Sequence, residues 1–163
     1  MAFQAVNELE HFNFEDCTIS MLRVQPDQIN IEVEALIVKR NNSQNTNYTD
    51  SYAATTQIGL KQGKIIGAIK DGYRYYDAND VLQQEVPDTK LNTMETEKLL
   101  KECSGAYLYE LQADKQEDGT YRGTIAIEFV DEAEQTMADS YRLEVTFEKS
   151  VVSWERYMNR VQN

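Results

Sequence analysis

The C-terminal half of the chain contains segments in which apolar and aromatic residues occupy every second position. The clearest is 121–129, in which Ile125, Ile127 and Phe129 alternate with polar or small neighbours, and the segment 141–147 repeats the pattern. Successive side chains of a β-strand point to opposite faces, so this period is typical of strands with one face in a core. Because the two segments are neighbours in the sequence, we expect them to form an antiparallel pair.

Similar short segments, separated by turn-forming residues, recur through the rest of the chain. The other predicted strands are 17–24, 29–39, 52–60, 65–69, 73–76, 81–86 and 106–113. Pro26 and Asp27 favour a turn that joins the first two of these as a hairpin. The turn at 61–64 is also predicted to close a hairpin, and residues 40–50, rich in Asn, are expected to form a polar loop.

One helix is predicted in the second half of the chain. Asn92 or Thr93 can cap its first turn, Leu99 and Leu100 lie on an apolar stripe, and Gly105 is suited to the position just after its end. A second, short helix is predicted over 151–161, where four apolar or aromatic residues have helical spacing. These are Trp154, Tyr157, Met158 and Val161.

The N-terminal segment also has apolar residues three positions apart. Phe3, Val6 and Leu9 have this spacing, which suits a short helix packed on the rest of the domain. Together, these segments predict a single β-rich domain, 1–163, of the α+β class with predominantly antiparallel strands. Its sheet is expected to be a sandwich or an open, curved, barrel-like sheet, with one central helix and a short C-terminal helix. A strongly curved sheet wrapped around the central helix is the alternative.

The charge of the chain excludes several classes of partner. A formal net charge of −12, from 28 acidic and 16 basic residues, disfavours binding to nucleic acid or to an anionic membrane. The chain has no apolar run near the roughly 20 residues that span a bilayer, and its first residues do not resemble a signal peptide. We therefore expect a small cytoplasmic protein, of a size and composition common in bacteria.

Motifs for catalysis, metals or cofactors are weak. His11 is the only histidine, so no His-pair mechanism is available, and it is more readily explained as a packing residue than as a general base. Cys17 and Cys103 belong to no metal-binding cluster. The segments 59–65 and 77–80 resemble a phosphate loop and a calcium loop only superficially, because each lacks required residues. The sequence predicts no cofactor and no metal site.

Tyrosines are the most suggestive side chains for binding. The chain has ten, and a cluster formed by Tyr73, Tyr75, Tyr107 and Tyr109, together with the neighbouring Tyr76, is the candidate interaction surface. Tyrosine offers rigid contact area and a hydroxyl group, so these residues could line a groove. They could equally be cross-strand pairs that stabilise the sheet, and a Tyr-rich sheet favours this second interpretation.

Two functional hypotheses follow from these observations. The first is a non-enzymatic protein-interaction module that binds a protein partner or forms a homodimer, through a free sheet edge or the tyrosine face. The second is a small-ligand-binding protein or enzyme with a pocket between the sheet and the central helix, using Asp, Glu and Tyr groups. The catalytic residues of such an enzyme are unknown from the sequence.

Overall fold

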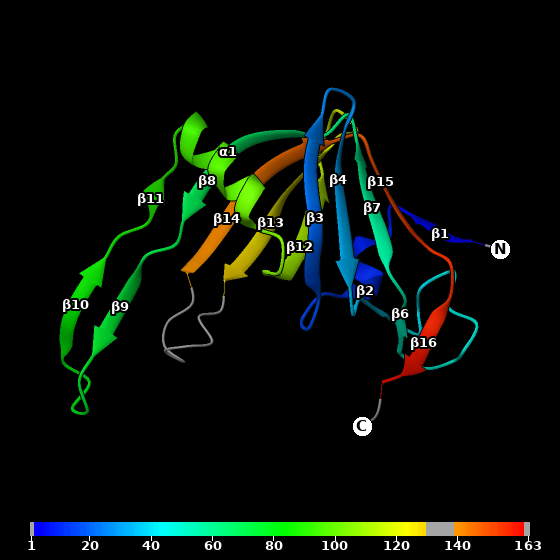
Figure 1. Ribbon diagram of the computed structural model, residues 1–163, viewed down its shortest axis with the longest axis horizontal. Coiled ribbons are helices and arrows are strands. Elements are labelled where there is room, and N and C mark those ends of the chain that lie inside the picture. The colour runs from blue at the N-terminus through cyan, green and yellow to red at the C-terminus, as the bar shows by residue number, and fades with distance from the viewer. Residues whose placement is uncertain (1, 130–138, 162–163) are drawn as a thin grey trace.

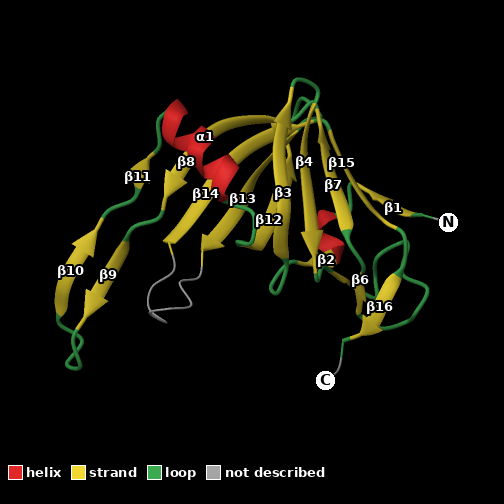
Figure 2. Ribbon diagram, in the orientation of Figure 1, coloured by secondary structure: helices red, strands yellow, loops and turns green. Residues whose placement is uncertain are grey.

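The computed structural model describes residues 2–129 and 139–161, and these are mostly antiparallel β-strands with one α-helix (Figures 1 and 2). Ten strands form one large, open sheet. In spatial order they are β1 (Phe3–Val6), β15 (Lys149–Trp154), β7 (Thr56–Lys61), β4 (Gln28–Glu34), β3 (Thr18–Gln25), β12 (Tyr107–Lys115), β13 (Tyr121–Phe129), β14 (Asp139–Phe147), β8 (Lys64–Lys70) and β11 (Thr89–Lys90). The predicted β-dominated fold is therefore confirmed, and the sheet is not closed into a barrel.

Two smaller sheets accompany the large one. The first has four strands, in the order β16 (Tyr157–Arg160), β6 (Ser51–Ala53), β5 (Ile37–Val38) and β2 (Phe12–Asn13). The second has two strands, β9 (Tyr73–Tyr76) and β10 (Leu82–Val86). The helical segments are α1 (Thr93–Glu102) and the single 3-10 turn η1 (Leu9–His11).

The alternating C-terminal segments pair as predicted. In the antiparallel β13–β14 ladder, Ile125 lies opposite Leu143 and Tyr121 lies opposite Phe147, whose rings stack with centroids 5.3 Å apart. The turn at Pro26 closes the β3–β4 hairpin, also as predicted. Side chains on one face of these strands are buried and those on the other face are more exposed, which accounts for the period of two in the sequence.

The turn at 61–64 is not the predicted hairpin. β7 and β8 do not pair with each other: β7 lies between β15 and β4, while β8 lies between β14 and β11. The chain makes a second corner between β14 and β15, and the backbone N–H of Glu148 donates to the carbonyl of Lys61 at 2.8 Å, joining the two corners. Both connections pass across the top of Figure 1, from one half of the sheet to the other.

These corners connect the two halves of the large sheet, which are β1, β15, β7, β4 and β3 on one side and β12, β13, β14, β8 and β11 on the other. The two halves enclose one core. Fully buried residues come from both halves, and they form a single hydrophobic cluster. Examples are Ile29, Ile31, Ile58 and Leu60 from β4 and β7, and Leu108, Ile125, Leu143 and Val145 from β12, β13 and β14. Burial of an aliphatic side chain of this kind stabilises the fold by about 1.5–3 kcal/mol.

The predicted C-terminal helix is wrong. Residues 149–154 form β15, which is hydrogen-bonded to β1 on one side and β7 on the other, and residues 157–160 form β16. Ser150, Val152 and Trp154 are buried on one face, so a period of two was present in this segment. The helical spacing of Trp154 and Tyr157 instead results from a bend between two strands, which brings their rings to 5.9 Å.

The N-terminal segment is also a strand rather than the expected helix. Phe3 lies opposite Trp154 in the β1–β15 ladder, and only the residues of η1 are helical. The Phe3 ring stacks on Trp154 with centroids 5.7 Å apart and also contacts Tyr157 at 4.9 Å. Tertiary packing on an aromatic cluster thus determines the structure here, rather than local spacing.

Helix α1 begins after Asn92, as predicted, and ends at Glu102, three residues before Gly105. Asn92 Oδ1 accepts a hydrogen bond from the N–H of Glu95 at 2.8 Å, and the Glu95 carboxylate accepts one from the N–H of Asn92 at 3.1 Å, which completes a capping box. Leu99 is buried on its inner face. The helix is not enclosed by the sheet: Figure 1 shows it lying across one face of β8, β14 and β13, so the expected central position is not observed.

Candidate functional site

Tyr73 and Tyr75 lie on a ribbon that extends beyond the large sheet. β9 pairs with β10 alone, and every residue of the two strands except Val86 is exposed. Figure 1 shows this β9–β10 hairpin projecting away from the rest of the molecule. An isolated two-stranded hairpin is only marginally stable in water, so this ribbon needs support from its base or from a partner.

Both faces of the β9–β10 hairpin carry exposed apolar groups. Tyr73 and Tyr75 lie on one face, and they are 38% and 57% exposed. Tyr76 is 47% exposed and lies on the other face, where it pairs with Leu82 of β10. Across the ribbon, Arg74 pairs with Glu85 at 3.1 Å. The hairpin therefore presents several aromatic side chains to solvent.

A cluster of charged residues fixes the base of the hairpin to the large sheet. From β14, the Arg142 guanidinium binds Asp71 at 2.5 Å and Asp88 at 2.8 Å. These carboxylates belong to the two legs of the ribbon, and Asp88 also accepts a hydrogen bond from the N–H of Gly72 at 2.7 Å. The hydrogen bond to Asp71 raises the pKa of Arg142 above its ordinary value. This Asp71–Arg142–Asp88 clamp holds both legs of the hairpin.

The structure places the other two predicted tyrosines elsewhere. Tyr107 and Tyr109 lie on β12, which is separated from β8 by β13 and β14, so the four tyrosines belong to two separate sheets. Tyr107 pairs with Glu128 and is 37% exposed. Tyr109 is partly buried, and burial, together with the nearby carboxylate of Asp71 and two glutamates, raises its pKa. The four tyrosines therefore do not form cross-strand pairs with one another.

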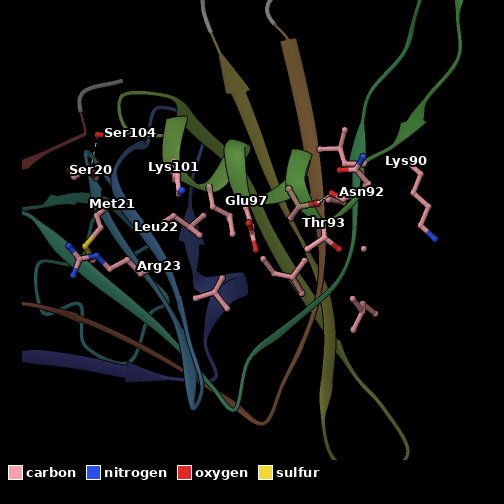
Figure 3. Close-up of a pocket in the computed structure, with 18 residues that line it drawn as sticks. Ser20, Met21, Leu22, Arg23, Lys90, Asn92, Thr93, Glu97, Lys101 and Ser104 are labelled. Carbon is pink, nitrogen blue, oxygen red and sulfur yellow. Dashed lines mark hydrogen bonds between the residues drawn. The ribbon is translucent and has the colours of Figure 1, made fainter.

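A groove of about 980 Å³ lies between α1 and strands β3 and β8. Its apolar lining comes from all three elements and from the segment that precedes the helix. These residues are Met21, Leu22 and Val24 of β3, Ile65, Ile66 and Ala68 of β8, and Leu91 and Leu100. At one end, Ser104 Oγ donates a hydrogen bond to the Ser20 carbonyl at 3.0 Å and joins the end of the helix to β3 (Figure 3).

The charged residues of the groove differ in sign from the molecule as a whole. Arg23, Lys90 and Lys101 line it, against one carboxylate, that of Glu97. Within the described ranges, none of these four side chains has an ion-pair partner within 4.0 Å. The groove is thus a basic and apolar site on a protein with a net charge of −12.

Another polar cluster joins the N-terminal segment to the Asn-rich loop. The Glu8 carboxylate accepts hydrogen bonds from the backbone N–H of Ser43 at 2.9 Å and from its hydroxyl, and it contacts His11 Nδ1 at 3.1 Å. Burial alone would raise the pKa of Glu8, but the hydrogen bonds from Ser43 and His11 outweigh it and lower that pKa. Both partners bind the carboxylate rather than each other, so the imidazole does not activate the hydroxyl.

The sequence did not predict the contact between Glu8 and Ser43. Glu8 and Ser43 are separated by 35 positions, and no motif links them. The two cysteines are buried free thiols. Burial, with a smaller effect of the Glu34 charge, raises the pKa of Cys17 to about 12, and burial also raises the pKa of Cys103. Neither thiol is suited to nucleophilic chemistry.

A scan against protein-family models found no matching family, and searches of the curated proteins and of the solved structures found no match either. Among the residues that the structure describes, no helix has the length and apolar character needed to cross a membrane. The acidic stretch of sequence at 131–134 lies outside the described residues.

Proposed function

We propose that this chain is a non-enzymatic protein-interaction module, and that the β9–β10 hairpin is the element that binds its partner. The observation that carries the proposal is the exposure of Tyr73, Tyr75 and Tyr76 on a ribbon whose two strands pair only with each other within residues 2–129 and 139–161. Aromatic side chains of this kind supply large contact area at low entropic cost, which is why tyrosine is frequent in protein interfaces.

The clamp at the base supports this role. Arg142 holds both legs of the hairpin, so the ribbon is positioned before a partner arrives. A binding element that is already ordered loses less conformational entropy on association, and more of the contact energy then appears as affinity. The same residues also account for the persistence of an otherwise solvent-exposed two-stranded sheet.

The outer edges of the hairpin indicate the chemistry of the partner. β9 and β10 pair only with each other in the part of the chain that the structure describes, which leaves outward-facing backbone groups on both strands. An extended segment of another protein can add to such an edge. Apolar pockets on that partner would then receive the tyrosines. We place this interaction in the cytoplasm, where the two thiols would stay reduced, and with a protein rather than a nucleic acid because the chain is acidic.

The test compares the double variant Tyr73→Ser, Tyr75→Ser with Tyr48→Ser. Tyr48 is 92% exposed on the Asn-rich loop, so its replacement removes an exposed tyrosine that lies outside the hairpin. Each tagged protein is used to capture partners from an extract of the encoding organism, and the bound proteins are quantified by mass spectrometry. We expect one stoichiometric partner that the hairpin variant loses by at least about tenfold and that Tyr48→Ser retains.

Three results would contradict the proposal. If both variants retain the same proteins in the same amounts, the hairpin is not the binding element. If sedimentation velocity shows a homodimer that the hairpin variant converts to a monomer, the partner is a second copy of the chain rather than a different protein. A stable monomer that captures no stoichiometric partner would argue against an interaction module altogether.

A further inference from the structure

We infer that the groove between α1, β3 and β8 binds a linear amphipathic anion, a long-chain carboxylate of the fatty-acid type. This site is separate from the β9–β10 hairpin and does not depend on the function proposed for it. Three features of the groove support this inference: its exposed apolar residues, the distribution of charge along it, and the hydrogen bonding of the helix N-terminus.

Exposed apolar side chains line the groove from both of its strands. Val24 of β3 and Ile66 of β8 are 45% and 47% exposed, although both belong to strands of the large sheet, and both line the groove. Leu91 and Leu100 also line the groove and are only partly buried. Removing apolar surface of this kind from water lowers the free energy. A single alkyl chain lying along the groove would cover these side chains.

The charges define where the carboxylate would lie. Figure 3 shows Arg23 and Lys101 at the end of the groove near Ser20 and Ser104, whereas Lys90 lies at the opposite end and points away. Glu97 lies between these ends, so it would repel an anionic group from the middle. Arg23 and Lys101, which have no ion-pair partner in the described ranges, are complementary to a carboxylate at their end.

The N-terminus of α1 does not compete for the anion. The Asn92–Glu95 capping box already occupies the backbone N–H groups of both residues. Glu95 also adds a negative charge at this end of the helix, which disfavours a second carboxylate there. The arrangement therefore assigns the headgroup to the Arg23–Lys101 end and the alkyl chain to the region between Val24 and Ile66.

The experiment is calorimetric titration with dodecanoate below its critical micelle concentration. Dodecyltrimethylammonium, which has the same chain length and the opposite charge, is the control ligand. We expect saturable binding of the anion at one site and at least tenfold weaker binding of the cation. The double variant Arg23→Gln, Lys101→Gln should weaken dodecanoate binding about tenfold, whereas Lys90→Gln, at the other end, should change it less than twofold.

A second variant tests the apolar lining of the groove. Ile66→Asp changes a side chain that is already half exposed, so the fold should persist, and it should abolish dodecanoate binding. Equal binding of the cation and the anion, an equal effect of Lys90→Gln and of the double variant, or no saturable binding would each overturn the inference. The variant Tyr73→Ser, Tyr75→Ser should bind dodecanoate normally, so failure of the hairpin proposal is distinguishable from failure of this one.

Discussion

Glu8 joins two segments that are far apart in the sequence, because its carboxylate binds both His11 and Ser43. Its pKa lies below the ordinary value of 4.5, so the folded state favours the ionised carboxylate more than the unfolded chain does. A lowered pKa stabilises the fold at pH values above the pKa of the group in the unfolded chain. This contribution is lost as the pH falls through the pKa of the group in the folded protein.

This linkage predicts a pH-dependent effect of Glu8→Gln. The variant should lower the melting temperature at pH 6, and the difference from the unchanged protein should shrink as the pH falls below about 4.5, where the carboxylate becomes protonated. Thermal melts at pH 6 and pH 3.5 measure it. Glu15→Gln, which removes an exposed carboxylate nearby, is the control. A Glu8→Gln effect of the same size at both pH values would show that the carboxylate charge is not involved.

The buried thiols lead to a second prediction at this scale. Burial raises the pKa of Cys17 to about 12, so almost no thiolate exists at neutral pH, and Cys103 is also buried. Neither should react with a disulfide reagent such as DTNB in the native protein at pH 8, and both should react rapidly in denaturant. The measurement is the absorbance of the released thiolate with and without guanidinium. Rapid reaction of one thiol in the native state would contradict its burial.

At the level of elements, the Asp71–Arg142–Asp88 clamp determines whether the β9–β10 hairpin is held in place. Arg142→Gln removes the charge that binds both carboxylates, and we expect the hairpin to open more often while the large sheet stays intact. Hydrogen exchange should accelerate at residues 73–86 and stay unchanged in β13. Arg122→Gln, which removes an exposed arginine from β13 with a longer ion pair of 4.0 Å, is the matched control. Equal exchange in both variants would mean that the clamp does not support the hairpin.

Strands whose pattern is local were predictable, and strands that depend on distant partners were not. The alternation in 121–129 and 141–147 identified β13 and β14 because one face of each strand is buried at several alternate positions, such as Ile125 and Ile127 or Leu143 and Val145. The segment 151–161 has both a period of two and a spacing of three, and only the ladders with β1 and β7 decide between them. Helix α1 was predictable because its capping box lies within four residues of sequence.

The candidate sites were predictable only in part, for the same reason. Tyr73 and Tyr75 were selected by their residue type, but their exposure depends on the β9–β10 pair standing apart from the large sheet, which no local pattern encodes. A pocket between sheet and helix was a general hypothesis. The residues that line the groove come from segments around positions 20, 65 and 95, and only the tertiary fold brings them together.

At the scale of the whole molecule, the two corners couple the halves of the large sheet. Gly63 lies at the first corner, where an added Cβ would be 2.7 Å from the Leu60 carbonyl oxygen and 3.0 Å from the side chain of Ile29. These neighbours belong to β7 and β4, so the backbone at the corner packs directly against one half of the sheet. A side chain here would force the corner to shift.

Gly63→Ala should therefore destabilise the protein by about 1–3 kcal/mol, the usual cost of overpacking a tight site. Gly59→Ala is the matched control, because its nearest contact would be an ordinary 3.7 Å to the Gln28 side chain, and its effect should be within about 0.5 kcal/mol. Urea unfolding followed by Trp154 fluorescence and by circular dichroism measures both variants. Since the corner belongs to both halves, the two signals should move together to a lower midpoint. Separate transitions in Gly63→Ala would mean that the halves unfold independently and that the corners do not couple them.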